Sequence, residues 1–181
     1  MTMNDFNRVV KWIQDPLIHK VFPSRLYHCP ISRDFIINPS LQSLYIIIEY
    51  NDIPIGYAEI TDIDWFRRTC LLLFLIGEEK FRNNMHWFKA YALLGYYIFE
   101  QLNLNYSVAV ILENNAINNK IFKSFLKARH SGIMNCAHYV DGDEISGNIY
   151  SFSKVDYLSA KKHYKKYLEK FCPIEISNLY R

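Results

Sequence analysis

The fold is decided by residues 70–104, which read CLLLFLIGEEKFRNNMHWFKAYALLGYYIFEQLNL. The apolar run Cys70–Ile76 has the length of a strand, and its unbroken hydrophobicity predicts burial on both faces, as in the middle of a sheet. From about His86 onward, apolar residues recur at helical spacing, which predicts an amphipathic helix that Asn103 closes. The segment is therefore interpreted as a buried strand, a loop and a helix.

The residues before this segment predict a short helix and two further strands. Val9–Trp12 forms the helix, which ends before Pro16 because the residue that precedes a proline disfavours the helical conformation. Leu44–Tyr50 and Ile53–Ile60 are rich in β-branched and aromatic residues, and Asn51-Asp52 between them indicates a hairpin. The strand of the deciding segment is expected to begin at Arg68.

Strand and helix patterns also alternate downstream. Tyr106–Leu112 predicts a strand, and Ile117–Leu126 predicts a helix. Ile133–Tyr139 and Ile145–Phe152 flank Asp141-Gly142, a dipeptide that suits a tight hairpin. A last helix is expected over 156–171, where lysines form a basic face with aromatic residues between them.

This order of elements predicts an α/β domain, of the α+β kind, with a central mixed sheet flanked by helices. We expect one domain over residues 1–158, followed by a C-terminal basic helix and tail over 159–181. The strand–helix–strand unit should hold parallel strands with a right-handed crossover. Its ligand end is the carboxyl end of the buried strand, where the start of the next helix favours an anion such as a phosphate.

Composition excludes several classes of protein. Half of the 181 residues are apolar, 16% are aromatic and the net charge is +3, so a packed core is expected and disorder is not. No apolar run approaches the length of a membrane span, and the first residues lack the layout of a signal peptide. The four cysteines lie far apart, so we expect free thiols, no metal site and a cytoplasmic protein.

In this order, three segments resemble the GNAT superfamily of N-acetyltransferases, specifically the Rim-type branch that modifies protein N-termini and small amines. They are IGEEKFRNNMHWFKAYALLGYYIFEQLNL at 76–104, ENNAINNKIFKSFLKA at 113–128 and GIMNCAHYVDGDEISGNIYSFSKVDY at 132–157. Together with VVKWIQDP and IPIGYAEI nearer the N-terminus, the resemblance covers roughly residues 6 to 158. It implies a GNAT-like acyltransferase fold with acetyl-CoA, or another acyl-CoA, as co-substrate.

The resemblance also implies a role for particular residues. The main chain of the buried strand would bind the pantetheine arm of the donor, and the loop and helix start would wrap its pyrophosphate. Asn115 matches the asparagine that meets the pantetheine arm, and Phe122 stands where many relatives have a tyrosine that protonates the leaving thiolate. The implied cofactor-binding residues are Phe74, Leu75, Ile76, Arg82, Asn83, Asn84, Met85, His86, Trp87, Phe88, Asn115 and Phe122.

The pyrophosphate loop departs from the family pattern. Asn83, Met85 and Trp87 occupy positions where the family has small residues, mostly glycine, which let the backbone approach a phosphate closely. The loop is therefore degenerate. Arg82 is a candidate phosphate ligand or an exposed cation, and Asn115 a candidate helix cap as well as a ligand.

A general base must take a proton from the ammonium group before the amine attacks, unless the free amine binds from solution. The central strand carries no carboxylate, so Glu59 on the preceding strand is the chosen base, with Asp62 and Asp64 as alternatives. The competing interpretation makes all three solvated turn and edge residues.

The leading hypothesis is an N-acyltransferase that moves an acetyl or other acyl group from acyl-CoA to a primary amine. The acceptor would be a small molecule, such as an amino sugar nucleotide, or a peptide N-terminus. Two alternatives remain open: an enzyme that takes its acyl group from an acyl carrier protein, which the basic tail would meet, and a non-catalytic binding module. The pattern predicts no membrane or nucleic-acid partner and leaves a homodimer open.

Overall fold

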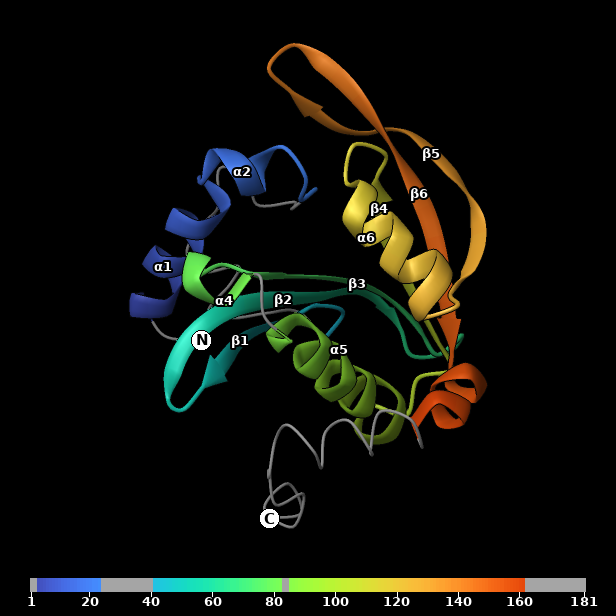
Figure 1. Cartoon of the computed structure of the whole chain (residues 1–181). Helices are drawn as coiled ribbons and strands as arrows, with labels where there is room; N and C mark the ends of the chain where they lie inside the picture. Colours follow the sequence, from blue (N-terminus) through green and yellow to red (C-terminus); the bar gives the residue numbers. More distant parts are fainter. Residues whose placement is uncertain (1–2, 24–40, 83–84, 162–181) are drawn as a thin grey trace.

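The structure is a computed structural model of the whole chain and describes residues 3–23, 41–82 and 85–161 (Figure 1). Its centre is a six-stranded mixed sheet with the spatial order β1-β2-β3-β4-β6-β5. The strands are β1 Leu44–Tyr50, β2 Ile53–Asp64, β3 Thr69–Ile76, β4 Tyr106–Leu112, β5 Arg129–Val140 and β6 Asp143–Ser153. The mixed sheet flanked by helices confirms the predicted fold class.

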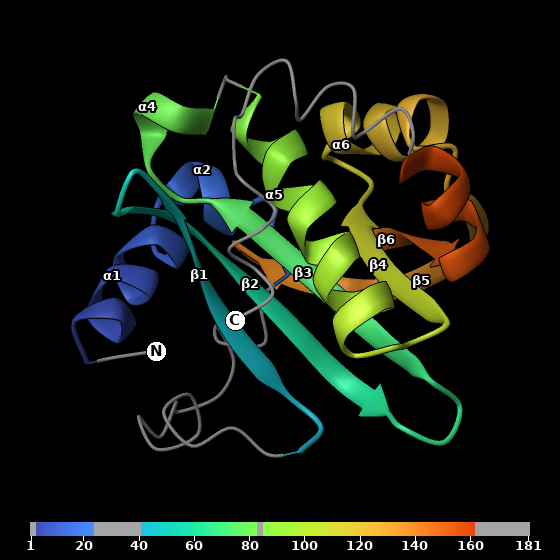
Figure 2. The same ribbon diagram turned by 90° about the horizontal axis from the view of Figure 1, so that it is seen from below.

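Helices cover the sheet on two faces (Figures 1 and 2). Helices α1 and α2 lie on one face, and α5, which connects β3 to the parallel strand β4, crosses the other. The helices are α1 Met3–Ile13, α2 Pro16–His19, α4 Glu79–Arg82, α5 His86–Tyr96 and α6 Ala116–Lys120. A π-helical turn follows α5 at Tyr97–Gln101 and another follows α6 at Ile121–Phe125, so the two predicted longer helices are each divided into two parts.

Both predicted hairpin turns are present, with the backbone conformations that their residues favour. Asn51 and Asp52 have φ angles of 50° and 60°, and Asp141 and Gly142 have φ angles of 54° and 94°. Positive values at both central residues match the twist of the flanking strands. Arg68, expected to start β3, has a φ angle of 59° and lies in the preceding turn, so the strand begins one residue later.

The two larger hydrophobic clusters hold the helices to the sheet, one on each face. Alternate side chains of a strand point to opposite faces, so neighbouring residues of β3 belong to different clusters. Leu72 packs with α5 and with Phe122 after α6, whereas Leu73 packs with α1 and α2. Strand β3 is thus buried on both faces, as its unbroken apolar run predicts.

The N-terminal helices are held at the end of β3 by specific contacts. The indole Nε1 of Trp12 donates a hydrogen bond to Glu78 at 3.1 Å, and a Cβ on Gly77 would overlap the indole ring. Asp15 caps α2 by accepting a hydrogen bond from the amide of Leu17 at 2.9 Å.

Residues 154–161 form the beginning of the predicted last helix, and the remainder of the expected tail, 162–181, lies outside the described residues. Lys161 bonds both carboxylate oxygens of Glu100, at 2.7 and 2.8 Å, and so packs against the domain. In the described part of the chain, no helix is both long and apolar enough to cross a bilayer.

Candidate functional site

The candidate site begins where strands β3 and β4 separate. Their parallel pairing covers three positions, from Thr69 with Tyr106 to Leu71 with Val108. Beyond Leu71, β3 stays paired with β2 on its other edge, as far as Ile76. The edge of β3 that faces β4 therefore presents main-chain groups to the space between the two strands.

A cavity of about 470 Å³ occupies this space. Its size lies within the range of small-molecule sites, and its walls come from both faces of the sheet because the gap between the strands passes through it. The lining residues are Leu17, Ile18, Val21, Phe22, Pro23, Leu72, Leu73, Phe74, Leu75, Ile76, Arg82, Trp87, Tyr91, Ala109, Val110, Ile111, Asn115, Ile117, Asn118, Ile121, Phe122 and Leu126.

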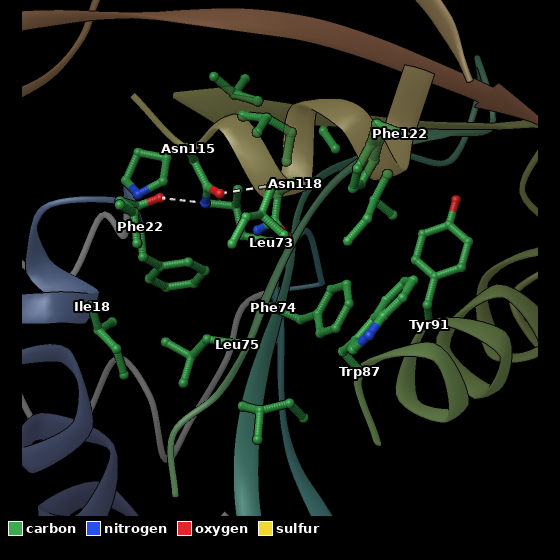
Figure 3. A pocket seen from close by; sticks show the side chains of 18 of the residues that line it. Ile18, Phe22, Leu73, Phe74, Leu75, Trp87, Tyr91, Asn115, Asn118 and Phe122 are labelled. Carbon is green, nitrogen blue, oxygen red and sulfur yellow. Dashed lines mark hydrogen bonds between the residues drawn. The ribbon is translucent and has the colours of Figure 1, made fainter. Parts of the chain in front are cut away.

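Aromatic rings form the wall on the side of α5, which we call the α5-side compartment (Figure 3). The rings of Phe74 and Tyr91 are 6.2 Å apart, and those of Tyr91 and Phe122 are 6.0 Å apart. Trp87 precedes Tyr91 by about one helical turn, so both side chains lie on the same face of α5. This compartment therefore combines residues of β3, α5 and the turn after α6.

The opposite wall, which we call the α2-side compartment, is aliphatic except for Phe22 (Figure 3). Ile18 of α2 and Phe22 just after it face Leu73 and Leu75 of β3, and these four side chains belong to one cluster. All four are less than 9% exposed.

Arg82 lies in the cavity wall, but its guanidinium also has partners within the chain. Its Nη2 bonds a carboxylate oxygen of Asp15 at 2.6 Å and the main-chain oxygen of Gly77 at 2.5 Å, while its buried Nε has no hydrogen-bond partner among the described residues. The hydrogen bond from Arg82, together with the one from the Leu17 amide, holds the pKa of Asp15 below its ordinary value. The sequence left two interpretations of Arg82 open, a phosphate ligand or an exposed cation. The second is wrong, because the Arg82 side chain is only 21% exposed.

His86, the first residue of α5, packs against aromatic rings rather than lining the cavity. Its ring centroid is 4.5 Å from that of Tyr50 and 5.0 Å from that of Phe81. Burial, assisted by the charge of Lys89, lowers the pKa of His86, which favours the neutral imidazole.

The other residues of the predicted pyrophosphate loop are distributed between surface and core. Met85 occupies the N-cap position of α5, is 40% exposed and makes no side-chain hydrogen bond to the helix. Phe88 is 2% exposed in the core and does not line the cavity. Asn83 and Asn84 lie outside the described residues.

Asn115 and Phe122 both line the cavity, as the resemblance implies for donor-binding residues. Asn115 also caps α6, because its side-chain oxygen accepts a hydrogen bond from the amide of Asn118 at 3.1 Å. Its amide group points to the main-chain oxygen of Val21 at 3.5 Å (Figure 3).

Glu59 lies one strand away from the cavity. It is 1% exposed on β2, and its register partner across the ladder is Leu73, which does line the cavity. Glu59 and Tyr57 share one face of β2, and burial followed by the charge of Glu59 raises the pKa of Tyr57. The competing interpretation of Glu59 as a solvated residue is wrong. The interpretation as a solvated turn residue is right for Asp64, which caps the turn after β2 by accepting hydrogen bonds from two amides.

Sequence reasoning missed the whole wall from α2 and the role of Tyr91. The spacing of Trp87 and Tyr91, four residues apart on a predicted helix, was a signal for a shared face. Residues 17–23 carried no such signal, since their approach to β3 depends on how the helices pack on the sheet.

Comparisons with known proteins address the fold. No protein-family model and no curated protein matches the sequence. Among solved structures, a presumed acetyltransferase matches with a TM-score of 0.74 and 15% identity, over 93% of this chain and 88% of that one. Another, from T. thermophilus, gives a TM-score of 0.74 and 13% identity, over 93% and 90% of the two chains.

The spermidine/spermine N-acetyltransferase SpeG from Vibrio cholerae matches with a TM-score of 0.62 and 14% identity, over 67% of this chain and 71% of that one. At such identities the likeness shows a shared fold. The chain thus shares the mixed-sheet fold of these acetyltransferase structures, which confirms the predicted fold class.

Proposed function

We propose that the protein is an N-acyltransferase that moves an acyl group from acyl-CoA to a primary amine of a small molecule or of a peptide N-terminus. The observation that carries the proposal is the cavity between β3 and β4, bordered by the open edge of β3 and lying next to the start of α5. An extended ligand can add to such an edge through main-chain hydrogen bonds, as a peptide does in β-augmentation. The fold of the neighbouring acetyltransferase structures supports this reading.

In this proposal, the pantetheine arm lies along the edge formed by Phe74, Leu75 and Ile76, and the diphosphate lies near Arg82 and the start of α5. The first amides of an 11-residue helix attract an anion, and the side chain at the N-cap does not bond them. The buried Nε of Arg82 adds a donor that no residue in the described part of the chain bonds. The residues that are present therefore fit a phosphate-bearing thioester donor.

The chemistry needs two proton transfers. The amine nitrogen attacks the thioester carbonyl carbon, the C–N bond forms, the C–S bond breaks, and the sulfur leaves as a thiolate. Glu59 is the proposed base, since it is the one carboxylate among the buried residues of the described chain, and it would take the proton from the amine through a water because it lies one strand away from the cavity. Phe122 lacks a hydroxyl and cannot protonate the thiolate. The proposed proton donor is Tyr91, which packs beside Phe122 and carries the one phenolic hydroxyl in the described cavity wall.

A second donor is favoured by the bulk at the start of α5. Trp87 lines the cavity and Met85 is exposed at the N-cap, so both stand where the nucleotide part of CoA would approach the helix. An acyl carrier protein presents the same phosphopantetheine arm without that nucleotide. Equal turnover with acyl-CoA and acyl carrier protein would remove the reason for this alternative.

Titration calorimetry with acetyl-CoA tests the proposal first, with adenosine 3′,5′-bisphosphate as the control ligand. We expect micromolar binding of acetyl-CoA, followed by release of free thiol when a panel of amines is added. Absence of binding up to millimolar concentration, together with no turnover from acyl carrier protein, would favour the non-catalytic binding module.

The role of the base is tested with Glu59→Gln against Glu79→Gln, an exposed carboxylate on α4. Loss of a general base lowers kcat by roughly 10²- to 10⁴-fold, and we expect that loss for Glu59→Gln alone. Circular dichroism establishes that both variants fold. A pH profile that Glu59→Gln leaves unchanged would contradict the assignment.

A further inference from the structure

The α2-side compartment offers its ligand an apolar surface. Ile18 and Phe22 contribute from the α2 region and Leu73 and Leu75 from β3, and all four side chains point into one hydrophobic cluster (Figure 3). A methyl group, as in an acetyl group, would contact only a small part of such a wall.

The described cavity wall also lacks negative charge. Its ionisable side chains are Arg82 and Tyr91, and Arg82 already bonds Asp15. A substrate with several ammonium groups would lose their hydration on entering and would meet no carboxylate in this part of the wall.

The mouth of the cavity is apolar as well. Leu17 of α2 and Ile117 of α6 line the cavity and are 70% and 75% exposed. When a hydrocarbon covers large aliphatic side chains at a binding site, apolar surface is removed from water, and this favours binding. The same chemical preference thus appears inside the α2-side compartment and at its entrance.

We propose that one of the two reacting molecules carries a hydrocarbon group of several carbons that fills the α2-side compartment. This inference rests on the acyl transfer proposed above. Two sources share this chemistry: the acyl chain of the thioester, or an apolar substituent on the acceptor amine. A polyamine is then a poor acceptor. Each methylene that becomes buried raises kcat/KM by about fourfold in either case, from the usual transfer free energy of a CH₂ group.

Two substrate series separate the sources, with release of free thiol as the readout from the full-length protein. The first varies the acyl-CoA from acetyl through butanoyl and hexanoyl to octanoyl with one amine. The second varies the amine from methylamine to hexylamine and phenethylamine, with spermidine as the polycation, at fixed acetyl-CoA. A rise along the first series assigns the compartment to the donor, and a rise along the second assigns it to the acceptor.

Flat profiles in both series, or preference for spermidine, would overturn the inference and leave the acyltransferase proposal intact. If no pair releases thiol, the acyltransferase proposal fails instead. Calorimetry then compares octanoyl-CoA with acetyl-CoA and hexylamine with methylamine, and equal affinities within both pairs overturn the inference.

A matched pair of variants tests the mouth. Ile117 and Val155 both lie on helical segments and are 75% and 76% exposed, but only Ile117 lines the cavity. We expect Ile117→Lys to lower kcat/KM about tenfold for the longest substrate of the responsive series and much less for the shortest. Val155→Lys should change neither. Equal losses for the long and short substrates in Ile117→Lys would contradict an apolar mouth.

Discussion

The two compartments of the cavity share β3 as a wall but are built in different ways. The α5-side compartment is lined by Phe74, Trp87 and Tyr91, which come from one continuous strand–helix segment, and the rings of Phe74 and Tyr91 are 6.2 Å apart. The α2-side compartment brings Ile18 and Phe22 onto the other face of the same strand. The first wall is largely local in sequence, whereas the second exists only because α1 and α2 dock on the sheet.

The attachments of the two walls differ too. Both sides are fixed by apolar packing, but the end of α2 and the residue after it are also joined to β5 and to the loop after β4 by hydrogen bonds to their carbonyl oxygens. His138 bonds the oxygen of His19 at 2.9 Å, and Asn114 donates to that of Lys20 at 2.8 Å. The buried cluster on the α2 side has fewer members than the one on the α5 side, so the α2 side is expected to open more readily.

The largest effect is expected from a truncation on the α5 side. Phe88 is 2% exposed and its ring packs 5.5 Å from that of Phe125, so Phe88→Ala should lower the free energy of unfolding by about 3–5 kcal/mol. Trp87→Ala should cost roughly half as much, because its ring borders an existing cavity and leaves less new void. Urea denaturation measures both, and equal losses would show that Trp87 is a core residue.

The difference between a wall that is local in sequence and a wall made by docking also explains which parts of the structure could be predicted from the sequence. The unbroken apolar run of β3 and the turn dipeptides at Asn51 and Asp141 act locally, so the strands and hairpins could be predicted. The place of Glu59 could not, because alternation along β2 gives its face but not what covers that face. The residues of the α2 side, such as Phe22, were missed for the same reason: tertiary docking decides them.

An intermediate effect is expected where one ion pair joins the two sides. Asp15 caps α2 on one side, and Arg82 is the last residue of α4 on the other. The carboxylate oxygen of Asp15 and the guanidinium nitrogen of Arg82 are 2.6 Å apart. Asp15→Asn keeps a cap but removes the charge, so we expect a loss of about 1–2 kcal/mol at pH 7. Urea denaturation at that pH measures the loss, and Asp5→Asn, on a neighbouring helix, is the control.

The pH dependence of that loss follows from the direction of the shift. Arg82 lowers the pKa of Asp15 from its ordinary value of 3.8, so the folded state binds this proton less readily than the unfolded state. The stabilisation is therefore complete well above pH 3.8 and is lost as the pH falls through the lower, folded-state pKa. The difference between wild type and Asp15→Asn should shrink under acid, and a constant difference between pH 7 and pH 3 would exclude the ion pair as its cause.

The smallest effect is expected at the exposed hydrogen bond from Asn114 to Lys20, which ties the α2 side to the loop after β4. Because the bond is open to solvent, Asn114→Ala should lower global stability by only about 0.5 kcal/mol. Its local effect should be larger, since the segment after α2 loses one of its few attachments. Hydrogen exchange should therefore quicken at the amides of Val21 and Phe22, whose hydrogen bonds to Ile18 open with that segment.

Asn135→Ala, an exposed asparagine on β5, is the matched control and should leave these amides unchanged. Exchange at the amides of α5 should stay slow in both variants, because apolar packing rather than this bond holds that side. If Asn114→Ala quickened exchange on both sides equally, the two compartments would open as one unit. The α2 side could then adjust to a longer hydrocarbon only together with the α5 side, which would couple binding in the two compartments.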